Sequence, residues 1–151
     1  SCLNSCFTER KVTTPFIGEL TLLKVTENIP FSMTPSSTNP IILPKKNKTV
    51  VTVVDSRVNS TNWKLYINYT NPMIESNGKV LIDSLLFKKF NNEELLLKTN
   101  KKLIYESGDN GGNVSVSNVT FSIDKGLFLK PSKDLIEDED YSTLIVWSVE
   151  E

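Results

Sequence analysis

Residues 62–69 read NWKLYINY, and this stretch decides the expected fold. Apolar side chains occupy every second position, at Trp63, Leu65, Ile67 and Tyr69. The positions between them carry mostly polar or amphipathic side chains. Because successive side chains of a strand point to opposite faces, the stretch predicts a β-strand with one face on a core and the other largely toward solvent.

Similar β-branched and alternating runs fill most of the chain, separated by turn residues. Further strands are predicted at 16–26, 29–33, 49–55, 79–90, 94–99, 102–106, 113–123, 125–130 and 141–149. Roughly ten short strands without a sustained helical period favour an all-β fold, an antiparallel β-sandwich of Ig-like or jelly-roll-like type. We expect a single domain at 12–151, preceded by an N-terminal leader at 1–11.

Four local features refine this prediction. Residues 124–126, DKG, predict a hairpin turn with glycine at a positive φ. The valines of 113–123 change parity along the strand, which predicts a bulge or break near 117–118. A strand is predicted at 94–99, and one short helix opening at Glu93-Glu94 is the alternative there. The run 141–149 is apolar on both faces, which predicts a central strand covered on both sides.

Charge and histidine content narrow the function. The chain has no histidine and a net charge of −1, so the commonest general base and metal ligand is missing. A nucleic-acid-binding protein would carry a basic excess, and a bilayer span needs about 20 apolar residues. Neither is present in the sequence. A glycosidase with two carboxylates is the enzymatic alternative, but no suitable acid pair stands out. We therefore expect no enzyme, no cofactor and no metal.

Three motifs occur in a fixed order: Asp55-x-Arg57, Trp63-Lys64-Leu65, and Tyr141 followed by Trp147-Ser148-Val149. In this order they resemble the WxL domain of Gram-positive cell-surface proteins. The resemblance spans about residues 18–149, and it departs from the family at Asn62 and at Val149, where a small residue and a leucine are usual. It implies a β-sandwich, secretion and, often, non-covalent binding to peptidoglycan.

The tryptophans and the charged pair have structural and ligand-binding interpretations. Trp63 and Trp147 lie in the apolar register of their strands, which favours core packing over stacking on the sugars of peptidoglycan. Asp55 and Arg57 are placed to form a charge-assisted pair that fixes a turn. Ligand recognition remains the alternative for each.

Cys2 and Cys6 lie in the polar leader. In an extended segment their Cα atoms would be about 13 Å apart, which is too far for a disulfide between them. A tight turn that joins them, zinc binding, and pairing with other chains are the alternatives. The leader has little to bury, so a neighbouring subunit that accepts it as a strand or cross-links it would order it.

Cysteine-bearing leaders of this arrangement are similar to those of disulfide-linked endospore appendage subunits. We therefore expect an extracellular structural protein of a Gram-positive-type bacterium. Its partners would be copies of itself, which assemble into a surface fibre or layer through the leader and intersubunit disulfides. The alternative is a WxL-type module or surface adhesin that binds peptidoglycan or other surface proteins.

Overall fold

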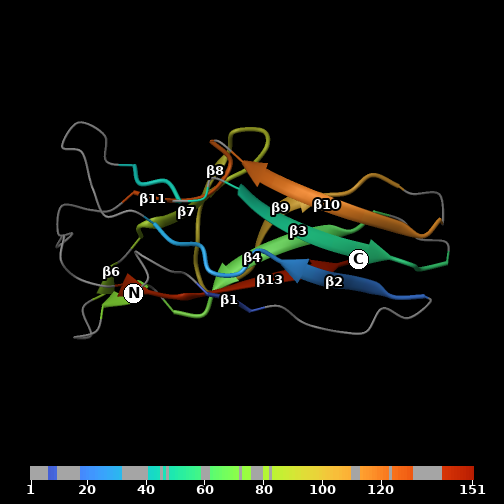
Figure 1. The fold of residues 1–151 in the computed structure, drawn as a ribbon, viewed down its shortest axis with the longest axis horizontal. Helices are drawn as coiled ribbons and strands as arrows, with labels where there is room; N and C mark the ends of the chain where they lie inside the picture. Colours follow the sequence, from blue (N-terminus) through green and yellow to red (C-terminus); the bar gives the residue numbers. More distant parts are fainter. Residues whose placement is uncertain are drawn as a thin grey trace.

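The computed structural model describes residues 7–9, 18–31, 41–44, 46, 48–58, 62–71, 73–75, 80–81, 83–109, 113–122, 124–130 and 141–151. These residues form strands and connecting segments, and none of them is helical (Figure 1). The strands are β1 (Phe7–Glu9), β2 (Leu20–Val25), β3 (Lys48–Asp55), β4 (Lys64–Tyr69), β5 (Met73–Glu75), β6 (Val80–Leu81), β7 (Leu85–Lys88), β8 (Glu94–Leu96), β9 (Lys102–Glu106), β10 (Ser115–Ser122), β11 (Gly126–Leu129), β12 (Tyr141–Ser142) and β13 (Leu144–Glu150). The predicted all-β class is confirmed.

The strands form four sheets. The largest has the order β1-β13-β4-β9, in which β1 runs parallel to β13 and the other neighbours are antiparallel. Three antiparallel sheets of three strands have the orders β10-β3-β2, β11-β7-β8 and β12-β5-β6. Figure 1 shows β10 and β3 running side by side, and β13 beside β4. The first and last described strands therefore meet in one sheet.

A single hydrophobic cluster joins three of these sheets. The alternation of residues 62–69 gives β4 a buried set at Leu65, Ile67 and Tyr69, as predicted. The same cluster takes in Val51 and Val53 of β3, Phe121 of β10, Phe87 of β7, and Ile145 and Trp147 of β13. Phe87 packs edge-on against both Phe121 and Trp147, with ring centroids 4.8 and 6.2 Å apart. Such edge-to-face pairs suit the quadrupoles of aromatic rings.

The predicted break in β10 is wrong. Its ladder with β3 runs without a register shift from Ser115 to Ser122. The inner face keeps one parity throughout, with Val119 and Phe121 buried, while Val116 is 63% exposed. The apparent change of parity arose because this valine faces solvent. Register shifts occur elsewhere, between Leu22 and Lys24 of β2 and in the β4–β9 pair.

The turn at residues 124–126 is present, but the predicted hairpin is wrong. Gly126 has a φ of +92°, and the Lys125 N–H donates to the Ser122 carbonyl at 3.2 Å. However, β10 pairs with β3 whereas β11 pairs with β7. The turn therefore carries the chain from one sheet to another. Sequence signals identify the turn residues, but the pairing partners depend on the rest of the fold.

The strand predicted at 94–99 begins at Glu94 and ends at Leu96 as β8, and the alternative short helix at Glu93-Glu94 is absent from these described residues. Strands β7 and β8 form a hairpin in which the Lys89 N–H donates to the Glu93 carbonyl at 2.9 Å. Asn92 adopts a φ of +71° in the turn, a region that asparagine tolerates better than most residues. Pairing with β7 outweighs the weak local preference of two glutamates for helix.

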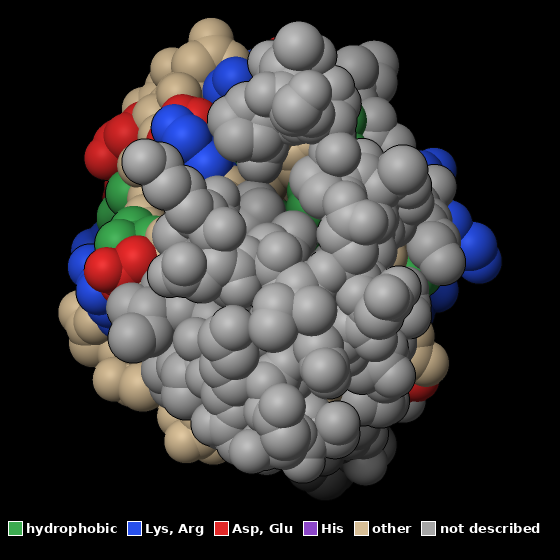
Figure 2. Space-filling model, turned by 90° about the vertical axis from the view of Figure 1, so that its left-hand side faces the viewer, with side chains coloured by type: hydrophobic (Ala, Val, Ile, Leu, Met, Phe, Trp, Pro, Cys, Tyr) green, Lys and Arg blue, Asp and Glu red, His purple; other side chains and the backbone are tan. Residues whose placement is uncertain are grey.

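The surface visible in Figure 2 carries both signs of charge. Among the described side chains around its margin, lysine or arginine and aspartate or glutamate are interspersed. Within the described ranges, no helix has the length and apolar character needed to cross a bilayer.

Candidate functional site at the edge of strand β13

The N-terminal strand β1 occupies part of one edge of β13. Its register is parallel and pairs Phe7 with Leu144, Thr8 with Ile145, and Glu9 with Val146. On its other side β13 pairs with β4 along residues 145–150. Part of the predicted leader thus forms a strand on the body of its own chain. An edge strand offers unpaired N–H and C=O groups, and an added strand satisfies them.

Within the described residues, β1 pairs with only the first half of this edge. Beyond Val146, no strand of the described part of the chain pairs with β13 on the β1 side. A cavity of about 730 Å³ lies here. It is bordered by β2, which is itself an edge strand of its sheet. Leu20 and Leu22 of β2 and Val149 of β13 provide its apolar lining.

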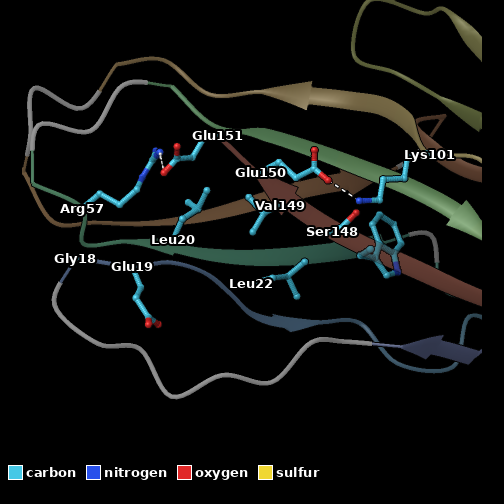
Figure 3. A pocket seen from close by; sticks show the side chains of 11 residues that line it. Gly18, Glu19, Leu20, Leu22, Arg57, Lys101, Ser148, Val149, Glu150 and Glu151 are labelled. Carbon is cyan, nitrogen blue, oxygen red and sulfur yellow. Dashed lines mark hydrogen bonds and ion pairs between the residues drawn. The ribbon is translucent and has the colours of Figure 1, made fainter.

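Two ion pairs lie at this cavity, as Figure 3 shows. Arg57 Nη1 lies 3.4 Å from Glu151 Oε1, and Lys101 pairs with Glu150. Each pair joins residues far apart in the sequence, so the end of the chain is tied to the segment after β3 and to the start of β9. The remaining charged residue of the lining is Glu19. The rim is therefore polar around an apolar interior.

Arg57 is fixed from beneath by Asp55, as the sequence predicts. Its Nε donates to Asp55 Oδ1 at 2.9 Å and its Nη2 donates to Oδ2 at 3.0 Å. Both side chains are buried, with exposed fractions of 10% and 1%. The hydrogen bonds to Asp55 raise the pKa of Arg57 above its ordinary value. The guanidinium is thus a permanently charged, rigid corner of the cavity.

Two polar groups beside the cavity have no partner among the described residues: the indole Nε1 of Trp147 and the Oγ of Ser148. Trp147 is 1% exposed. A buried donor without an acceptor costs about 1–3 kcal/mol.

The remaining tryptophan motif residues pack in or against the hydrophobic core. Trp63 is 2% exposed and packs against Tyr105, with ring centroids 5.5 Å apart. Its backbone N–H donates to Ser107 Oγ at 2.8 Å. Leu65 is fully buried, and half-buried Val149 packs against the same cluster. Neither tryptophan ring is available for stacking on a sugar in this conformation.

Tyr141 pairs with Glu75 in the small sheet of β12, β5 and β6, which is a different sheet from that of β13. The run 141–149 is therefore two strands. Ile145 and Trp147 are buried on one face of β13, whereas Leu144 and Val146 are only half-buried on the other, so the predicted cover on both sides is partial.

Cys2 and Cys6 lie outside the described residues. Among those that are described, no group of three or more histidine, cysteine, aspartate or glutamate side chains could hold a metal ion. The sequence predicts that the leader adds as a strand to a neighbouring subunit, whereas residues 7–9 add as β1 to the edge of β13 in the same chain. What this arrangement can do chemically is bind extended backbone.

Comparison with family models, with curated proteins and with solved structures found no match to the chain.

Proposed function

We propose that the chain is a non-enzymatic structural subunit, secreted from a Gram-positive-type bacterium, that assembles with copies of itself into a surface fibre or layer. The leader carries the contact between subunits. One observation supports this above the others: residues of the leader dock as β1 along the edge of β13. The body thus has a binding site for a leader strand along the edge of β13, and every copy offers the same site.

The short length of β1 makes it suitable for exchange. It contributes three residues, all at the margin of the sheet. A backbone hydrogen bond adds a net of about 0.5–1.5 kcal/mol, so a ladder of this length is weak on its own. Release of β1 costs little compared with the rest of the fold, and it exposes an edge that a second copy can fill.

The cysteines supply covalent linkage in this proposal. The chain has two, Cys2 and Cys6, and both precede β1. A disulfide between two copies must therefore join one leader to another leader. Disulfides persist outside the cell, where the proposal places the protein. The weak strand contact would set the geometry, and the disulfide would make it permanent.

A β-sandwich of Ig-like or jelly-roll-like type is the architecture that fits this role. Its support is the single cluster shared by β3 and β10 with β4 and β13, which belong to different sheets. Two sheets on one core form a rigid body. A rigid body with a releasable terminal strand is what an assembling subunit requires.

The test is the size of the purified chain under oxidising and reducing conditions. We expect a ladder of multimers on a non-reducing gel that collapses with reductant, and fibres or sheets by electron microscopy. The C2S/C6S variant should lose the covalent ladder, and a variant lacking residues 1–11 should also lose the assemblies. A wild-type chain that stays monomeric with free thiols would overturn the proposal. Co-sedimentation of that monomer with peptidoglycan would favour the wall-binding alternative.

A further inference from the structure

We infer that the edge of β13 accepts β1 from a second copy, in the same parallel register, so that subunits join head to tail. This inference rests on the proposed function and names its partner and its seat. The pairing of β1 with β13 within one chain would then be the closed, monomeric form, and the exchange of β1 between two copies would give the open form. Because the swapped strand makes identical contacts, the inference needs no new surface.

The first argument is the unused capacity of the edge. β1 pairs with only Leu144, Ile145 and Val146 of a strand that continues to Glu150. Beside the uncovered part lies the cavity of about 730 Å³. Half-buried Leu20 and Val149 contribute to its lining, and the Ser148 hydroxyl has no hydrogen-bond partner among the described residues. This unpaired part of the edge lies beside the site of β1, so a strand from a second copy has access to the edge when the chain's own β1 leaves it.

The second argument is the tether. Gly18 is anchored to the body, where its N–H donates to the Ser56 carbonyl at 2.9 Å, and it lies at the rim of the cavity. Between Glu9 and Gly18 the sequence has a separation of nine residues (18 − 9), which can span about 30 Å when extended. That length allows β1 to leave the β13 edge of its own chain and to reach the β13 edge of a neighbouring copy.

The third argument is direction. A parallel strand can enter only one way, with Phe7 at Leu144 and Glu9 at Val146. The donor and acceptor surfaces of one copy are therefore different surfaces. Such heterologous contacts repeat without limit unless the rotation closes a ring. Since the closed form benefits from a high effective concentration, exchange is favoured at high protein concentration and then held by the leader disulfides.

Cross-linking across the register distinguishes the two forms. In the C2S/C6S background, Glu9→Cys and Val146→Cys are made in separate chains, mixed at high concentration and treated with a short bis-maleimide. Exchange predicts a covalent heterodimer of these two chains. The matched control replaces Val146→Cys with Glu94→Cys, an exposed position in a different sheet. Heterodimer at least fivefold above this control is the expected result.

One chain carrying both Glu9→Cys and Val146→Cys reports the closed form and shows that the variants fold. If this chain cross-links internally while the mixture gives no more heterodimer than the Glu94 control, the exchange is wrong. The wild-type assemblies would then still stand and would require another contact. If wild-type protein forms no assemblies at all, the proposed function fails as well, so the two failures are distinguishable.

Discussion

The carboxylate of Asp55 accepts three hydrogen bonds from Arg57: one from the backbone N–H at 3.1 Å and two from the guanidinium. The pair closes the turn that follows β3 and leaves Arg57 Nη1 directed at Glu151. A local motif of two residues thus also positions the last described residue. Both partners are buried, so each depends on the other for its charge to be tolerated.

Replacement of Asp55 by alanine should lower the free energy of unfolding by about 3–5 kcal/mol, because it leaves the buried guanidinium without its main partner. Urea denaturation at neutral pH measures this. Lys98→Ala is the matched control: it removes an ammonium that pairs with Asp83 at 2.8 Å on the surface, and such pairs contribute about 0–1 kcal/mol. Equal losses for the two variants would contradict a structural role for the buried pair.

Gly126→Ala should destabilise the fold by about 1–2 kcal/mol, because a φ of +92° is unfavourable for a residue with a Cβ. That Cβ would also lie 3.1 Å from the Cβ of Phe121. Gly108 has neither constraint and nothing within 4 Å of an added Cβ. Thermal unfolding should therefore show little change for Gly108→Ala, and a comparable loss there would refute the argument from backbone conformation.

Trp147→Phe should be far milder than Trp147→Ala. The indole N–H has no described acceptor, so phenylalanine gives up no hydrogen bond and keeps much of the packing on Phe87. We expect a loss below about 1.5 kcal/mol for phenylalanine and of about 3–5 kcal/mol for alanine. Chemical denaturation of both variants tests this. A large loss with phenylalanine would reveal a hydrogen bond that the indole makes.

Intrinsic fluorescence should report two tryptophans in apolar surroundings. Trp63 and Trp147 are 2% and 1% exposed, so iodide should quench native emission weakly and unfolded emission strongly. Soluble peptidoglycan fragments should leave the native spectrum unchanged. A spectral shift that saturates with added fragments would show that one of these rings binds sugar.

Regular alternation made several strands predictable. Strand β9 matches its predicted bounds, and β3 and β4 differ from theirs by at most two residues at either end. The Asp55–Arg57 pair was also predictable, because a spacing of two on a turn allows the side chain to reach back. These features depend on neighbours in the sequence, and a local pattern is enough to specify them.

Features that depend on distant residues could not be read from the sequence. An apolar residue at the exposed position Val116 makes the sequence pattern of β10 suggest that the buried face changes along the strand. Only the pairing with β3 shows that β10 stays regular. The strand at 94–99 is predicted, but its pairing with β7 could not be read from the sequence. The cavity requires β2 and β13 to lie next to each other, although more than a hundred residues separate them.

The pairing of β1 with β13 also sets an order of events during synthesis. Residues 7–9 are made well before their partners at 144–146, which follow them in the sequence by more than 130 residues. Throughout that interval the nascent segment has no native seat on its own polypeptide. Completed neighbours, by contrast, already possess one. In the proposed assembly, newly made chains are thus most receptive to one another before each closes upon itself.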